Sequence, residues 1–281
     1  MNRFKNFFKK VFNVIKRPEM AVLPGQLAFF FVLSVVPIVT LITYGTSFLH
    51  LSMDFIGNFI DKAFGEDIVD LIVPMVSVSN IDFRFFLTLF VGFVIASNGA
   101  TSIIVTSNSI YGIPNTNFIR RKTKAVIMTF IIVILFIFIL IVPVFGKSII
   151  EAITFVNMNE TITNTITFVF NLLKGPITWF IIFCFIKILY TMAPDRKLES
   201  IYVNYGAVFT TVMWIIITAL YSYYINHFAN YAVFYGGLAN IVMLMLWVYF
   251  LAFIFVIGMA LNYKEEVIKL EKTGAIKIVE E

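Results

Sequence analysis

Side chains that could do chemistry are few in this chain, and most of them are polar rather than ionisable. Two histidines, His50 and His227, lie near the ends of apolar runs, and neither has a second ligand at a spacing that would bind a metal. The sequence contains no glycine-rich phosphate loop and no nucleophile elbow. We therefore predict no catalytic residue, no metal site and no cofactor.

The clearest polar pattern lies in the apolar run 84–106 and just beyond it. Polar side chains recur there at steps of three and four residues, the spacing that places them on one face of a helix. They are Asn98, Thr101, Ser102, Thr106 and Ser109, with Asn108 near the end of the face. Inside a membrane such a face must look toward neighbouring helices or water. Hydrogen bonding between helices explains it at least as well as a path for a substrate.

Three further features join this face as candidates for a substrate path. Lys187 is the one formal charge inside a predicted span; it either snorkels to the interface, which we favour, or faces a polar cavity where it would meet an anionic headgroup. Pro37 would bend its helix, and Gly236, one turn before Asn240, would allow close helix approach. The candidate path comprises Pro37, Asn98, Thr101, Ser102, Asn108, Lys187, Gly236 and Asn240.

Composition decides which elements must position these residues. Of the 281 residues, 60% are hydrophobic and 13% are charged, whereas soluble domains carry about 25% charged residues. So few charges exclude a water-soluble enzyme and a disordered chain. The single cysteine, Cys184, excludes an intrachain disulfide. The net charge of +5 reflects basic loops at the ends of apolar runs, so we predict no nucleic-acid partner.

Six apolar runs are long enough to span a bilayer as helices, which takes about 20 residues each. They cover roughly 24–48, 84–106, 125–146, 175–193, 205–226 and 236–262. Strands that cross a membrane are shorter and alternate polar with apolar residues, which these runs do not. We therefore predict an all-α polytopic membrane protein, with six transmembrane helices in a membrane domain over 20–263 and a cytoplasmic tail over 264–281.

Residues 1–19 predict a separate amphipathic helix that lies on the membrane surface. Apolar side chains recur at helical spacing from Phe4 to Ile15, and most basic residues lie off that stripe. The expected partner is membrane lipid of the anionic inner leaflet. Sixteen of the 21 Lys and Arg residues fall on the side of the two termini, which places both termini in the cytoplasm and the chain in the cytoplasmic membrane. A homo-oligomer is compatible with the sequence.

The last predicted span and several shorter stretches resemble a known family. FANYAVFYGGLANIVMLMLWVYFLAFIFVIGMALNY joins a Tyr-Gly pair to a span containing LWVY, and supporting pieces are LAFFFVLSVVPIVTLI at 27–42, NSIYGI at 108–113 and LYTMAPDRK at 189–197. Together they resemble the YihY/BrkB family of bacterial inner-membrane proteins over roughly 15–265. That family usually ends its last span with Gly-Ala-Glu-Leu, and Ala260 stands here where the acid is expected.

The resemblance implies an envelope protein, for which serum resistance and transport of lipid or lipopolysaccharide precursors have been suggested. The family has also carried a ribonuclease BN label, but metal-dependent RNA cleavage needs clustered ligands that two isolated histidines do not supply. We therefore predict that the chain is not an enzyme and that it transports or flips a lipid-like or amphipathic substrate. The alternative is a non-transporting envelope scaffold or assembly protein.

Overall fold

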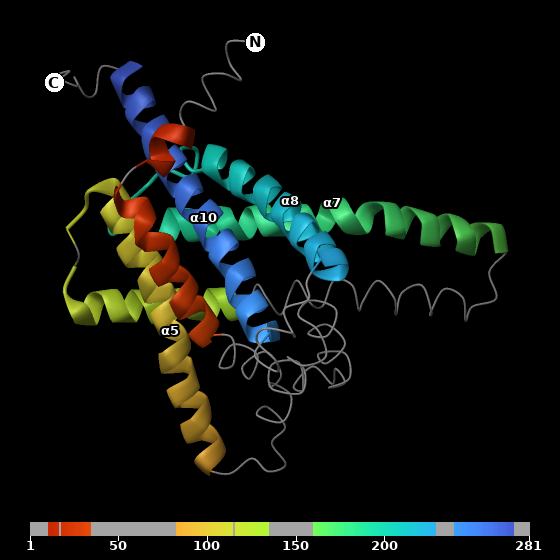
Figure 1. The fold of residues 1–281 in the computed structure, drawn as a ribbon, viewed down its shortest axis with the longest axis horizontal. Helices are drawn as coiled ribbons and strands as arrows, with labels where there is room; N and C mark the ends of the chain where they lie inside the picture. Colours follow the sequence, from red (N-terminus) through yellow and green to blue (C-terminus); the bar gives the residue numbers. More distant parts are fainter. Residues whose placement is uncertain are drawn as a thin grey trace.

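The structure, a computed structural model, describes residues 11–16, 18–34, 83–114, 116–134, 160–228 and 239–272. Within these ranges all regular structure is helical and no residue forms a strand (Figure 1). The long helices are α5 (Phe83–Tyr111), α7 (Glu160–Met192), α8 (Asn204–Phe228) and α10 (Ala239–Lys272). Shorter helical stretches are the 3-10 turn η1 (Pro18–Ala21), the helix Leu23–Ser34, and residues 11–15 and 118–134. The predicted all-α class is confirmed.

Each long helix contains an apolar segment long enough to cross a membrane. These segments are Phe90–Tyr111, Gly175–Met192, Asn204–Tyr224 and Val242–Lys264. They coincide with four of the six predicted spans. The other two predicted spans are helical at Leu23–Ser34 and at 125–134, and the rest of each lies outside the described residues. A polytopic membrane protein is confirmed, and the total of six spans stays a prediction.

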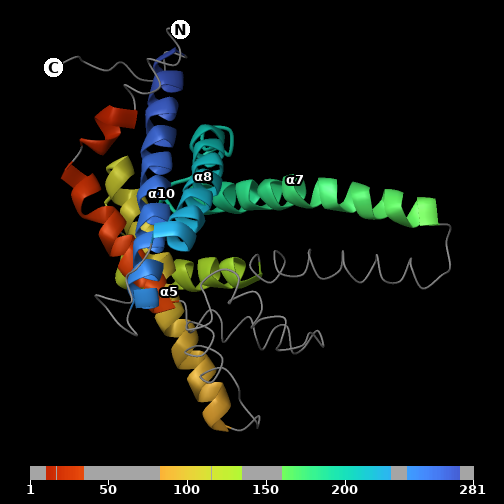
Figure 2. The same cartoon turned by 45° about the vertical axis from the view of Figure 1, so that its right-hand side comes forward.

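Helices α8 and α5 pack against α10, and α7 packs against α8. The contact between α8 and α10 is the most extensive between two of the labelled helices. Figures 1 and 2 show that α7 runs across the direction of α10 instead of alongside it, and that residues 118–134 cross α5 in a similar way. The connection between α7 and α8 therefore meets α5 and α10 near one end of the molecule.

Two glycines bring α8 and α10 together at the closest crossing. A Cβ on Gly206 would collide with the carbonyl oxygen of Gly258, and a Cβ on Gly258 would collide with the hydroxyls of Thr210 and Tyr190. Tyr190 of α7 donates a hydrogen bond of 2.8 Å to the carbonyl of Phe255, which ties α7 to α10 at the same level. Small residues allow this approach where side chains would hold the helices apart.

Part of the predicted surface helix is also present. Residues 11–15 are helical, with Val14 buried against the core while Phe12 and Ile15 of the predicted apolar stripe stay exposed. Exposed apolar side chains of this kind suit contact with lipid. Residues 1–10 lie outside the described residues, and the division into three segments stays a prediction.

Candidate functional site

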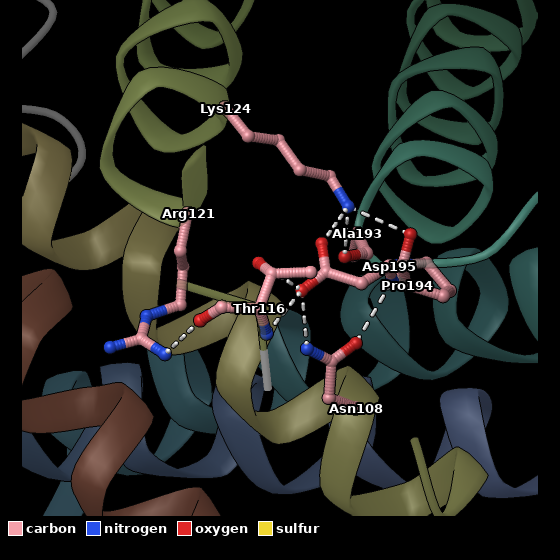
Figure 3. Close-up of polar contacts among 7 residues, drawn as sticks. All are labelled: Asn108, Thr116, Arg121, Lys124, Ala193, Pro194 and Asp195. Carbon is pink, nitrogen blue, oxygen red and sulfur yellow. Dashed lines mark hydrogen bonds and ion pairs between the residues drawn. The ribbon is translucent and has the colours of Figure 1, made fainter. Parts of the chain in front are cut away.

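Four polar side chains, which we call the Asp195 cluster, meet where the turn after α5 contacts the α7–α8 connection: Asn108, Thr116, Lys124 and Asp195 (Figure 3). Asn108 Nδ2 donates to Asp195 Oδ2 at 2.8 Å, and the Asp195 backbone N–H donates to Asn108 Oδ1 at 2.9 Å. Thr116 Oγ1 donates to the same carboxylate oxygen at 2.9 Å. The Lys124 ammonium lies 2.8 Å from Asp195 Oδ1. Both oxygens of the carboxylate therefore have partners.

A glycine cap at the carboxyl end of α5 positions Asn108 and Thr116 on the same carboxylate. Gly112 has a φ of 63°, and its N–H donates to the carbonyl of Ser109 at 3.2 Å. The N–H of Ile113 donates to the carbonyl of Asn108 at 2.8 Å. These two bonds form a Schellman cap, in which the left-handed residue is usually glycine. The cap turns the chain back sharply, so that Thr116 reaches the carboxylate already bound by Asn108.

Lys124 also satisfies the end of α7. Its ammonium donates to the carbonyls of Ala193 at 2.8 Å and Pro194 at 2.7 Å, in addition to Asp195 (Figure 3). Because α7 ends at Met192, these carbonyls directly follow the helix, and a cation at its carboxyl end is favourable. Burial alone would raise the pKa of Asp195, but hydrogen bonds from Lys124, Asn108 and Thr116 and the Lys124 charge lower it to about 2. The carboxylate is therefore ionised, and both of its oxygens bind groups of the protein.

A second ion pair fastens the same connection to α10. The Arg196 guanidinium donates to the Glu266 carboxylate and lies 5.1 Å from the centre of the Tyr111 ring. That ring in turn contacts Tyr263 edge to face at 5.4 Å between centroids. Burial raises the pKa of Glu266, and the nearby Arg196 charge offsets only part of that effect. Asp195 and Arg196, adjacent in sequence, therefore bind different helices and fix α5 and α10 to the α7–α8 connection.

A lysine of the 118–134 helix, Lys122, contacts the polar face of α5. Lys122 Nζ donates to Asn98 Oδ1 at 2.7 Å and to the carbonyl of Val94 at 3.3 Å. Asn98 lies thirteen residues before Tyr111, which is about 20 Å along the helix axis. In the sequence the basic run 120–124 is typical of a connector between two spans, so it does not single out Lys122. Since residues 118–134 form a helix that folds across α5, the Lys122 ammonium instead reaches the middle of a span.

Two hydroxyls on successive turns of the same face have no hydrogen-bond partner. Ser102 and Thr106 are 2% and 0% exposed, and neither hydroxyl meets a donor or acceptor among the described residues. Thr101 differs, since its hydroxyl donates to the carbonyl of Ser97 at 2.8 Å. We call Asn98, Ser102, Thr106 and Lys122 the mid-span face. The predicted polar stripe thus divides into this face and the partnered Asn108.

The other predicted path residues do not join this face in the described part of the chain. Lys187 is half-buried in α7, and its ammonium has no hydrogen bond or ion pair with any described residue; Asp195, two turns away, pairs with Lys124 instead. Asn240 lies in the first turn of α10, but its side chain is outside what the structure describes, as are Pro37 and Gly236 altogether.

The side chains of both histidines lie outside the described residues. His227 lies in α8 with a side chain outside the description, and His50 is outside it entirely. Across the described ranges, no three His, Cys, Asp or Glu side chains are grouped to hold a metal ion.

Long apolar helices joined by close glycine contacts and buried polar bonds define a polytopic membrane protein. The chain belongs to the BrkB family: the family model described as Virulence factor BrkB matches residues 11–276. It is 28% identical over 263 residues to the ribonuclease-like protein YfkH of Bacillus subtilis (strain 168), covering 92% of this chain and 94% of that protein. It is also similar to the UPF0761 membrane protein IL2447 of Idiomarina loihiensis, with 31% identity over 34% of this chain and 35% of that protein. No solved structure matches it.

Proposed function

We propose that this protein moves a lipid-like or amphipathic molecule across the cytoplasmic membrane, along the mid-span face of α5. The observation that carries the proposal is the pair of buried hydroxyls without partners, Ser102 and Thr106. A buried polar group that makes no hydrogen bond costs about 1–3 kcal/mol. Two such groups lie on successive turns of the helix that Lys122 contacts at Asn98, which favours a ligand that binds there and is released.

The arrangement of the rest of the molecule fits that role. The excess of Lys and Arg on one side supports cytoplasmic termini. The exposed Phe12 and Ile15 support a surface helix that rests on the anionic inner leaflet. The Asp195 cluster would then hold the cytoplasmic end of the bundle while polar groups deeper in the membrane meet the substrate. The proposal includes no enzymatic step.

Reconstitution in liposomes tests the proposal directly. Vesicles of phosphatidylcholine and phosphatidylglycerol would carry a trace of a headgroup-labelled fluorescent lipid and the purified full chain. Adding the membrane-impermeant reductant dithionite quenches the outer leaflet, so flipping shows as additional quenching. We expect additional quenching that increases with the amount of protein per vesicle. Quenching equal to that of protein-free vesicles, for this lipid and for other lipid classes, would contradict the proposal.

A second candidate is a non-transporting scaffold of the envelope. It is favoured by the row of exposed apolar side chains along α8, which suits contact with another membrane protein as well as with lipid. Examples are Val208, Val212 and Ile216, which are 52%, 49% and 44% exposed. The scaffold predicts that substitutions at Asn98, Lys187 and Asn240 leave the cellular phenotype intact. It also predicts that changes in the surface loops abolish co-purification of a partner, whereas the transporter predicts the opposite pattern.

A further inference from the structure

The Lys122 ammonium contacts the middle of the apolar segment Phe90–Tyr111, and none of the described residues places an anion beside it. Its two acceptors, Asn98 Oδ1 and the Val94 carbonyl, are neutral. No carboxylate of a described residue lies within ion-pair distance of it. An ammonium in a membrane is stable only when it reaches water or pairs with a negative group. Asn98 lies about 20 Å along the helix axis from the Tyr111 end of α5, which is farther than a lysine side chain extends.

The donor groups around this position match an anion with several oxygens. A lysine ammonium has three N–H donors, and Lys122 uses two of them within the protein. The third meets no acceptor among the described residues and could bind a ligand. Ser102 and Thr106 follow Asn98 at intervals of four residues, so they lie on the same face, and their hydroxyls are also without partners. The face therefore presents one charged donor and two hydroxyl donors along successive turns.

We propose that Lys122 binds the phosphate of an anionic lipid headgroup at the level of Asn98, with Ser102 and Thr106 as the next hydrogen-bond donors along the path. The inference rests on the proposed function, because it names the substrate class that the mid-span face takes. Phosphate is the anionic group that acidic membrane lipids share, and it offers acceptor oxygens to several donors at once. A free phosphate ion has the same chemistry, so the experiment separates the two sources.

The test is thermal unfolding of the purified full chain in a neutral detergent with added ligands. The arms are phosphatidylglycerol, phosphatidylcholine and inorganic phosphate at equal phosphorus concentrations. We expect phosphatidylglycerol to raise the unfolding temperature more than phosphatidylcholine does, because ligand binding stabilises the folded state. An equal rise with inorganic phosphate would support the phosphate site and assign it to the free ion. Equal rises with the two lipids and none with inorganic phosphate would contradict the proposal.

Single substitutions test whether the stabilisation by phosphatidylglycerol depends on Lys122. Lys122→Gln should weaken the apparent affinity for phosphatidylglycerol by about tenfold or more, since a hydrogen bond to a charged group is lost. Lys197→Gln is the matched control, because it removes a lysine charge from an exposed position in the α7–α8 connection and should leave the affinity unchanged. A Lys122→Gln protein that responds as the unmodified chain does would overturn the proposal.

Asn98→Asp tests the site even if Lys122→Gln fails to fold. The new carboxylate would lie where Asn98 Oδ1 now accepts from Lys122 and would neutralise the ammonium within the protein. We expect this variant to fold and to lose the response to phosphatidylglycerol. Retention of the response would contradict the site.

The outcome is separable from that of the transport assay. Flipping in liposomes without selective binding at Lys122 removes this inference alone, whereas selective binding without flipping removes the proposed function.

Discussion

The Asp195 cluster and the mid-span face both place polar groups among apolar helices. In the first every member has a hydrogen-bond partner, whereas in the second Lys122 and Asn98 bind each other and two hydroxyls have no partner among the described residues. Asp195 accepts hydrogen bonds from three side chains, and its partners come from α5, the turn after it and the 118–134 helix. On the mid-span face, Ser102 and Thr106 are as deeply buried yet make no hydrogen bond among the described residues. Buried polar groups normally have partners, so the second region calls for an explanation beyond stability.

If the proposed function holds, this difference separates a structural role from a binding role within one helix. Asn108 and Thr106 lie two residues apart on α5, and both are fully buried. The first joins α5 to the α7–α8 connection, whereas the second leaves a hydroxyl unused. Burial and residue type alone therefore do not tell a functional polar group from a structural one. The presence or absence of a hydrogen-bond partner distinguishes the two cases. It predicts that removing the Asn108 amide lowers stability, whereas removing the Thr106 hydroxyl does not.

The largest expected effect comes from breaking the Asp195 cluster. Asp195→Asn removes the charge that pairs with Lys124, whose ammonium then stays near the end of α7 without an anion. We expect the free energy of unfolding to fall by about 3 kcal/mol, measured by denaturant titration in detergent micelles. Glu199→Gln, an exposed acid in the same connection, is the control and should change it little. A loss no larger than that of the control would remove the structural role of the cluster.

A substitution where α8 and α10 cross at Gly206 and Gly258 should lower the free energy of unfolding nearly as much. Gly206→Ala adds a Cβ that collides with the carbonyl oxygen of Gly258, and we expect a loss of about 2–3 kcal/mol. Gly175→Ala in α7 meets no atom within 4 Å and should be neutral or stabilising, since alanine favours the helix. The same unfolding titration compares the two proteins. Equal stability of the two would show that α8 and α10 do not pack as closely as described.

The Asp195 cluster should also weaken in acid. Its folded pKa of about 2 lies below the ordinary value of 3.8, so the ionised carboxylate stabilises the folded state at higher pH. That stabilisation, about 2 kcal/mol, is complete above the unfolded value and is lost as the pH falls from about 4 toward 2. Unfolding titrations across this range should therefore show a smaller slope with pH in Asp195→Asn than in the unmodified chain. Identical slopes would contradict the assignment.

On the mid-span face, removal of a polar group is expected to leave the free energy of unfolding unchanged or to raise it, whereas in the Asp195 cluster removal lowers it. Thr106→Val removes a buried hydroxyl without a partner, so stability should be unchanged or rise by about 1 kcal/mol. Thr129→Val makes the same change where the hydroxyl donates to the Ala125 carbonyl at 2.8 Å, and it should cost about 1 kcal/mol. Denaturation of both variants under one set of conditions gives the comparison. A greater cost at Thr106 than at Thr129 would show that the Thr106 hydroxyl has a stabilising partner.

The smallest effect is expected at Glu266, where burial and the Arg196 charge act in opposite directions. Because its folded pKa is raised, the stability it contributes is present below the ordinary value and is lost as the pH rises through the folded value. Glu266→Gln should therefore change the free energy of unfolding near neutral pH by less than about 1 kcal/mol. A loss as large as that of Asp195→Asn would mean that the two ion pairs are equivalent.

The sequence predicted the helices better than it predicted the contacts between them. The runs 175–193 and 205–226 agree closely with Gly175–Met192 and Asn204–Tyr224, because the length of an apolar run is a local property. The polar stripe on α5 was also visible as a spacing. The sequence could not show that Asn108 has a partner while Ser102 and Thr106 do not, because Asn108 bonds to Asp195, which lies 87 positions away in the chain.

Lys122 was missed for a related reason. Its basic neighbours are typical of a loop, and only the direction of the 118–134 helix brings its ammonium onto Asn98. Lys187, which the sequence singled out, is inside a predicted span but has no described link to the mid-span face. A charge pattern along the chain reports topology, and it does not report which helices cross.

The most direct test of a binding role for the mid-span face is the flipping rate of the double variant Ser102→Ala/Thr106→Val in liposomes. The rate is compared with that of the unmodified chain at equal amounts of folded protein, together with the unfolding free energy of both. We expect a flipping rate at least about tenfold lower with stability unchanged or higher, because under the proposed function the lost hydroxyls serve the substrate and not the fold. An unchanged flipping rate, or a loss of rate that follows a loss of stability, would contradict it.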